Sequence, residues 1–149
     1  MARVFEHRWL WLGRRLVPDA VGGGARPVGA CVARARSDDR LHELRRGGFQ
    51  LADDAQRAQL ALGLLPCLAS PDPALRDEVA FEGLSTWLRG GALSLATARQ
   101  LGEALLPMLL RPEATGVAAP FAALALAEVA RVDRLKPIWT VEERLAMLQ

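Results

Sequence analysis

The stretch at residues 64–88, LLPCLASPDPALRDEVAFEGLSTWL, decides the fold. It predicts two helices joined by a tight Ser-Pro-Asp-Pro turn, because Asp72 is a preferred N-cap residue and proline is tolerated at the first helical position. The second helix is expected to end at Gly90 and Gly91, where a glycine pair stops a helix readily. Pro66 lies late in the first helix, where a proline removes a backbone donor and bends the helix.

The same pattern recurs about forty residues further along the chain, which is a typical period for helical repeats. The motif Leu-Leu-Pro-Cys-Leu at 64–68 returns as Leu-Leu-Pro-Met-Leu at 105–109. Phe81 and Phe121 are equivalent positions in the two units. HEAT-type arrays have this period and two helices in each repeat, and their hairpins bury their apolar faces by stacking. The sequence therefore predicts an all-α fold, a short right-handed α-solenoid of HEAT-like α-α hairpins.

Helix signals continue on both sides of this stretch. Asp53 and Ser94 are N-cap residues, and Thr140 with Glu143 forms a capping box. No segment shows a sustained alternation of polar and apolar residues, so no strand is predicted. The expected helices span approximately residues 37–46, 54–69, 73–89, 95–110, 118–132 and 141–149.

Charge divides the chain into two parts. Residues 1–36 carry seven arginines against Glu6 and Asp19, whereas residues 37–149 carry twelve basic and fifteen acidic residues. We predict a basic N-terminal extension with a glycine-rich linker over residues 1–36 and a helical domain over residues 37–149. A mildly acidic domain has no basic face for nucleic acid, so we expect no nucleic-acid partner.

The extension leaves several interpretations open. Residues 3–17 can form a short basic helix with Trp9 on its apolar stripe, which suits a membrane surface or a transit peptide. We favour an extension that docks on the domain, or a misassigned start codon. Val28 to Cys31 has the shape of a lipoprotein cleavage box but lacks the preceding apolar stretch, so lipidation is not expected. No apolar run approaches the ~20 residues that span a bilayer.

The two cysteines, Cys31 and Cys67, form no Cys-x-x-Cys motif and no disulfide framework. Cys67 lies on an apolar helical stretch, where a thiol behaves as a small hydrophobic side chain. We therefore expect a reducing environment and a cytoplasmic location, with a periplasmic or lipid-anchored form left open.

Arg76 and Asp77 are the most informative polar residues. On an α-helical wheel both fall inside the apolar arc of their helix, so we expect them to be largely buried and hydrogen-bonded. One interpretation is a ligand-binding pair. We favour a structural polar pair that joins neighbouring helices, because both residues lie in the first turns, where helix ends and loops supply partners.

The residue types that commonly carry catalysis are not grouped in this sequence. His7 and His42 have no carboxylate or cysteine at ligand spacing, and Ser85 and Thr86 have no nearby histidine. We predict no catalytic residue, no metal site and no cofactor in this chain, and leave open whether it belongs to an enzyme.

Glu142 and Glu143 are better explained as first-turn charges of the last helix than as a catalytic pair. Trp87 lies in the middle of an apolar arc and is expected in the core. Trp139 stands beside a helix cap and is either a core residue or an anchor for a partner.

The DPALRD run at 72–77 and the FAAL stretch at 121–124, followed by Asp133, resemble the bacterial domain-of-unknown-function family 2785. The resemblance covers residues 37–149. It departs from the family at 119–121, where Ala-Pro-Phe stands in place of the usual Arg-Ser-Phe. It implies an all-helical, HEAT-like fold and no established activity. The family continues with a stretch rich in Trp, His and Asp, so we expect the domain to be truncated at its C-terminus.

These observations favour a protein-binding or scaffold module. One alternative is the N-terminal part of an enzyme whose polar or metal site lies beyond residue 149. Another is a peripheral membrane protein that uses residues 3–17. We also expect self-association through a C-terminal apolar edge, because the helix at 118–132 is apolar on nearly every side.

Overall fold

The computed structural model describes residues 31, 38–111 and 116–149. These residues form helices joined by turns and contain no strand, so the predicted all-α class is confirmed. The expectations for residues 3–17, for the glycine-rich linker and for the cleavage-box residues 28–30 lie outside the described residues, as do those for His7 and Ser37.

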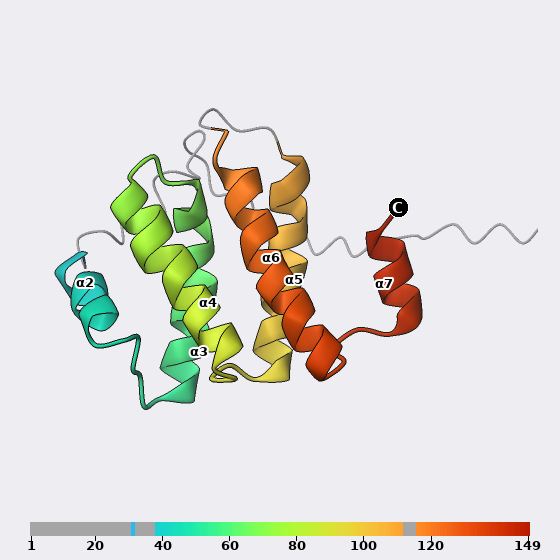
Figure 1. The fold of residues 1–149 in the computed structure, drawn as a ribbon, viewed down its shortest axis with the longest axis horizontal. Coiled ribbons are helices and arrows are strands. Elements are labelled where there is room, and N and C mark those ends of the chain that lie inside the picture. Colours follow the sequence, from blue (N-terminus) through green and yellow to red (C-terminus); the bar gives the residue numbers. More distant parts are fainter. Residues whose placement is uncertain (1–30, 32–37, 112–115) are drawn as a thin grey trace, which may run out of the picture.

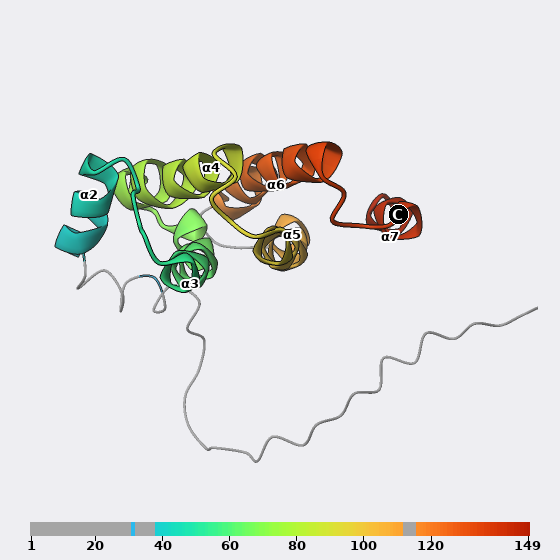
Figure 2. The same ribbon diagram turned by 90° about the horizontal axis from the view of Figure 1, so that it is seen from below.

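The helices form two layers with one short helix at each end (Figures 1 and 2). One layer contains α3 and α5, and the other contains α4 and α6. α2 and α7 lie at opposite ends. The elements are α2 (Asp38–Arg46), α3 (Asp54–Leu64), η2 (Leu65–Ala69), η3 (Ala74–Phe81), α4 (Glu82–Arg89), α5 (Leu95–Leu110), α6 (Ala118–Leu135) and α7 (Val141–Met147).

The helices begin at the caps that the sequence predicts. Asp53 accepts hydrogen bonds from the backbone N–H groups at the start of α3, at 2.8 Å and 3.1 Å. Ser94 accepts from the N–H of Thr97 at the start of α5. Thr140 and Glu143 form the complete capping box of α7. Each cap satisfies a backbone donor that the helix itself leaves unpaired.

The geometry inside the first hairpin differs from the continuous α-helices that were expected. α3 gives way at Leu64 to a tighter 3₁₀ segment, η2, which contains Pro66. After the turn, the chain first forms a π-helix, η3, and then the α-helix α4. Pro66 supplies no N–H for an α-helical bond, which favours the change of geometry at this point.

The two hairpins pack against each other, helix α4 on α6 and helix α3 on α5. Phe81 and Phe121, the equivalent positions of the two units, meet edge to face with ring centroids 6.0 Å apart. Trp87 is buried in the core as predicted, and its Nε1 donates a hydrogen bond of 2.8 Å to the carbonyl of Phe49. The largest fully buried side chains are those of Trp87, Leu68, Leu84, Leu101, Leu105, Val79 and Val129.

An aromatic ring closes each end of the stack by lying on a glycine of a helix. Phe49, which follows α2, lies on Gly83 of α4, and Trp139, which precedes α7, lies on Gly102 of α5. A Cβ at Gly102 would come within 2.5 Å of the Trp139 ring, so glycine is what allows this approach. Trp139 is therefore a core residue, which decides between the two roles that its sequence position allowed.

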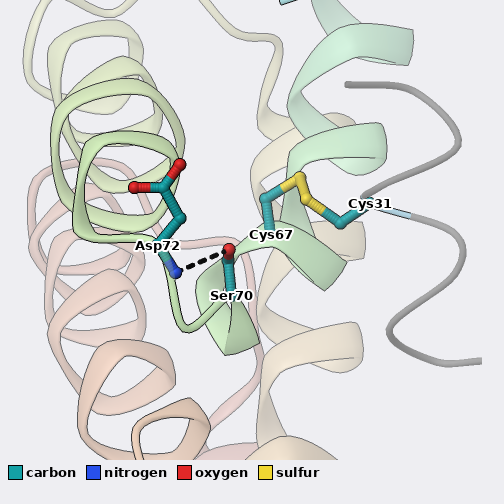
Figure 3. Close-up of a disulfide and its surroundings, with 4 residues drawn as sticks. All are labelled: Cys31, Cys67, Ser70 and Asp72. Carbon is teal, nitrogen blue, oxygen red and sulfur yellow. Dashed lines mark hydrogen bonds between the residues drawn. A yellow bond between two sulfur atoms is a disulfide. The ribbon is translucent and has the colours of Figure 1, made fainter. Parts of the chain in front are cut away.

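Cys67, expected to be a buried thiol in a reducing environment, instead forms a disulfide with Cys31 (Figure 3). Their Cα atoms are 5.1 Å apart and both side chains are buried. Cys67 belongs to η2, and the hydrogen bond from the Asp72 N–H to the Ser70 hydroxyl lies in the turn just after it. The fold brings together residues separated by 36 positions, which spacing alone does not reveal.

α6 is not covered on every side. Leu124 is half exposed, whereas its equivalent in the first unit, Leu84, is fully buried. Val141 and Leu145 of α7 and Leu148, which follows its last turn, are all exposed. In the described part of the chain, no helix is both long enough and apolar enough to span a bilayer.

Candidate functional site

A pocket of about 330 Å³ lies where the end of α4, the start of α5 and the end of α6 meet. We refer to it as the α4–α6 pocket. α4 ends here because Gly91 adopts a φ of +65°, which L side chains rarely adopt, and the chain then turns into α5 at Ser94. Residues far apart in the sequence therefore line one site.

Apolar side chains form much of the lining of the α4–α6 pocket. Leu88 and Ala98 are buried parts of the core, and Leu93 and Val132 are partly buried. Two further leucines that line it are unusually accessible, since Leu95 is 43% exposed and Leu135 is 65% exposed. Exposed leucines beside a buried apolar wall can pack against an apolar group of a binding partner.

Three cationic side chains, those of Arg89, Arg131 and Lys136, also line the pocket. Arg89 forms an ion pair with Glu128 of α6. The hydrogen bond from Arg89 lowers the pKa of Glu128, the charges of Arg89 and Arg131 act in the same direction, and burial opposes them. Glu128 therefore stays ionised and neutralises one of the cations.

Arg131 and Lys136 have no such partner. Within residues 38–111 and 116–149, no carboxylate lies within ion-pair distance of either side chain. The site thus combines apolar walls with positive charge that the described residues do not neutralise.

A second pocket of about 520 Å³ lies on the other side of the α4–α5 loop, against α3. Its arginine, Arg57, is already occupied. It forms an ion pair with Asp54 and donates to the backbone carbonyls of Leu51 and Ala92, the latter at 2.7 Å. Arg57 therefore fastens the α2–α3 and α4–α5 loops to α3, and this pocket offers no comparable free cation.

Arg76 and Asp77, the polar pair singled out in the sequence, lie next to each other at the start of η3. Arg76 donates to Asp77 at 2.6 Å and to the carbonyl of Ser70 at 3.2 Å. Its guanidinium also lies 4.8 Å from the centroid of the Phe121 ring. These contacts tie the Ser70 turn and both hairpins together, and neither residue lines the α4–α6 pocket.

The burial expected for Asp77 was wrong. Only 14% of the Arg76 side chain is exposed, but the Asp77 side chain is 44% exposed. The wheel assumed α-helical geometry, whereas η3 is a π-helix with bonds from residue i to i+5. More residues per turn shift each side chain away from its α-helical angle, so Asp77 turns toward solvent.

The remaining polar candidates do not assemble into a catalytic set. Ser85 is buried, and its hydroxyl has no hydrogen-bond partner among the described residues, while Thr86 is exposed. Glu143 binds Arg99 and caps α7, while Glu142 is an exposed first-turn charge. The described residues contain no group of three His, Cys, Asp or Glu side chains placed to hold a metal.

Asp133 organises the link between α6 and α7, a role that sequence reasoning missed. Its carboxylate accepts from the N–H groups of Ile138 and Trp139, at 2.8 Å and 3.2 Å, and from Arg144 at 2.7 Å. The hydrogen bond from Arg144 lowers the pKa of Asp133 to about 2, and the two backbone donors add to this effect while burial opposes it. An aspartate in the last turn of a mostly apolar helix was the sequence feature that could have predicted this role.

Neither protein-family models, nor curated proteins, nor solved structures give a match to this chain.

Proposed function

We propose that this chain is a protein-binding module built from two stacked HEAT-like hairpins. The support for the hairpin assignment is the pairing of equivalent positions, in which α4 packs on α6, α3 packs on α5 and Phe81 meets Phe121. Units of this kind bury their cores between neighbours and leave their loops and helix ends available for partners. Membership of family 2785 is part of the same proposal and rests on the motifs at 72–77 and 121–124.

One observation carries the binding role, namely the mixed character of the α4–α6 pocket. Its exposed leucines, Leu95 and Leu135, border cationic side chains that include Arg131, an arginine with no ion-pair partner among the residues that the structure describes. Protein interfaces typically centre on an apolar contact, with arginine enriched around it. A pocket of about 330 Å³ admits one or two side chains of a partner segment.

The test is to place a photo-crosslinking amino acid at Leu135 in the full chain, in cells of the source organism. Leu110 is the control position, because it is 87% exposed and lies at the other end of α5, about 22 Å from Leu95 at 1.5 Å per residue. We expect a discrete protein adduct from position 135 and none from position 110. The captured protein is then purified and its Kd is measured directly.

Leu95→Ser with Leu135→Ser should weaken that Kd by at least about tenfold, because two apolar contacts are lost. Leu110→Ser should leave it unchanged. Equal adducts from both positions, or a Kd indifferent to the pocket leucines, would show that the pocket is not the binding site.

The disulfide is evidence about the cellular compartment in which the module acts. Disulfides persist in oxidising compartments and are rare in the cytosol, so the Cys31–Cys67 bond favours an oxidising compartment over the cytoplasm expected from the sequence. Alkylation in denaturant of the protein as isolated from its source, before and after reduction, tests this, because burial would protect both side chains in the folded chain whether or not they are bonded. Two thiols that become reactive only after reduction support the oxidising compartment, and two that react without reductant support the cytoplasm.

A further inference from the structure

The charge around the α4–α6 pocket is opposite to that of the domain. Arg89, Arg131 and Lys136 line the pocket, and Glu128 is the carboxylate that pairs with one of them. Residues 37–149 as a whole carry more acidic than basic residues. The local excess of positive charge is therefore a property of this site and does not follow from a basic composition.

Two features strengthen the positive potential at the pocket. The N-terminus of α5 opens into it at Ser94, and the helix dipole adds partial positive charge there. The apolar walls of Leu88, Leu93 and Val132 reduce the access of water, so a charge held against them interacts more strongly than one on an open surface. Arg131 is itself partly buried and lies near enough to Glu128 to lower its pKa.

We infer that the segment which docks in the α4–α6 pocket is acidic, with an apolar side chain between Leu95 and Leu135 and flanking carboxylates on Arg131 and Lys136. This inference rests on the proposed protein-binding function and names the chemistry of the partner. A carboxylate matches the two unpaired cations, and an apolar side chain matches the two exposed leucines. A basic or neutral segment would offer no carboxylate to Arg131 or Lys136 while removing part of their hydration.

Selection from a random peptide library displayed on phage tests this inference with the full chain, kept oxidised. Peptides selected on the wild type should be enriched in Asp and Glu beside Leu, Ile or Phe. Synthetic fluorescein-labelled copies of the selected peptides then report the Kd by fluorescence anisotropy. We expect the Kd to rise roughly tenfold when the salt concentration is raised from ~0.05 M to ~0.5 M, because the contact depends on charge pairs.

Matched variants locate the contact. Arg131→Gln with Lys136→Gln removes two charges at the pocket and should raise the Kd about tenfold. Arg46→Gln with Arg111→Gln removes the same charge from two exposed positions elsewhere and should change the Kd less than twofold. Circular dichroism shows whether each variant is folded, and the salt titration of the wild type tests the charge dependence without any substitution.

The outcomes separate this inference from the proposed function. If the library yields no specific binder, the protein-binding function itself fails. If the selected peptides are neutral or basic, or if the pocket variant binds acidic peptides as well as the wild type does, the acidic segment at this pocket is refuted while peptide binding stands. Acidic peptides that lose affinity only in the pocket variant support the inference.

Discussion

At the α2 end of the stack Phe49 lies on Gly83, and at the α7 end Trp139 lies on Gly102. The two contacts are alike, but the other interactions that hold α2 and α7 to the stack differ. At the α2 end Leu41 and Phe49 are both buried, and the carbonyl of Phe49 accepts a hydrogen bond from the buried Trp87. At the α7 end no residue of the helix itself is buried.

Ion pairs take the place of apolar burial at the α7 end. Arg99 of α5 binds Glu143 at 2.5 Å and donates to the carbonyl of Ile138 at 2.8 Å. Arg144 of α7 binds Asp133 of α6 at 2.7 Å. The α2 end also has ion pairs, from Arg45 to Glu78 and Glu82, but there they add to buried apolar side chains, whereas α7 is held by charge with no buried residue of its own. Segments with little buried apolar surface open at low free-energy cost, so α7 should be the first helix to detach.

The largest difference between the two ends should appear on reduction. The Cys31–Cys67 disulfide ties the chain before α2 to η2, and no disulfide holds the α7 end. Reduction should lower the free energy of unfolding by about 3–4 kcal/mol, because the unfolded chain regains the freedom of a long loop. Urea unfolding with and without a thiol reductant measures this.

Cys31→Ala is the control for the reduction experiment. Without reductant it should match the reduced wild type, and reductant should not change it further. A wild type whose unfolding midpoint is indifferent to reductant would contradict the disulfide as a stabilising link.

The next largest difference should appear when the glycine at each end is replaced by alanine and the free energies of unfolding are compared. In a helix, Gly→Ala ordinarily stabilises by up to about 1 kcal/mol. Here the new Cβ meets Phe49 Cε1 at 2.9 Å in Gly83→Ala and Trp139 Cζ2 at 2.5 Å in Gly102→Ala. We expect Gly83→Ala to lower the free energy of global unfolding by about 1–3 kcal/mol, since displacing Phe49 also disturbs the acceptor of Trp87.

Gly102→Ala should act locally. Displacement of Trp139 should abolish the hydrogen-exchange protection of α7 while the hairpins keep theirs, and global stability should fall by about 1 kcal/mol or less. Native-state hydrogen exchange measures both variants. Equal global losses, or an α7 that stays protected in Gly102→Ala, would remove the distinction between the ends.

The sequence predicted the features that depend on local chemistry. Asp53, Ser94 and the Thr140–Glu143 box mark helix starts because a cap is formed by residues within three positions of each other. The repeat also predicted that Phe81 and Phe121 hold equivalent places, and they pack together. Local patterns and the periodicity of the sequence were sufficient to predict the all-α fold class.

Features that depend on long-range proximity were not predictable in this way. The Cys31–Cys67 bond, the Trp139 ring on Gly102 and the α4–α6 pocket all join residues from separate elements. No spacing rule signals them. The π-helical geometry of η3 is a further case, because η3 directly follows the turn that contains Pro71 and Pro73 and packs against η2 and α4.

Arg76→Ala should lower the free energy of unfolding by an intermediate amount. Arg76 lies at the contact between the two hairpins, away from both ends of the stack. Arg76 holds the Ser70 carbonyl and Asp77 and lies against Phe121, so its removal leaves a turn carbonyl without this donor and loosens the contact between the hairpins. We expect a loss of about 1–2 kcal/mol, reduced by the solvent that reaches the half-exposed Asp77. A loss below ~0.5 kcal/mol in urea unfolding would show that these contacts contribute nothing to stability.

Acid should release α7 with little effect on the remaining helices. The hydrogen bond from Arg144 lowers the pKa of Asp133 to about 2, and that from Arg99 lowers the pKa of Glu143 to about 2. Both folded values lie below the values of about 4 expected for the detached helix. Each group therefore stabilises the docked state fully above pH 4, and this contribution is lost as the pH falls from about 4 to about 2.

The fluorescence of Trp139 can report this release, because its ring leaves a buried site when α7 detaches. The chain has four tryptophans, so the other three, Trp9, Trp11 and Trp87, are replaced by phenylalanine. Trp139 is then the sole source of tryptophan fluorescence. In that protein we expect a red shift of the emission between pH 4 and pH 2, with helical circular dichroism largely retained. Asp133→Asn with Glu143→Gln should show the shifted emission already at pH 7, because neither replacement carries the charge that Arg144 and Arg99 bind. An emission spectrum that stays constant down to pH 2, or that changes only together with the loss of all helical signal, would mean that Trp139 on Gly102 holds α7 without the ion pairs and that both ends of the stack are closed by packing.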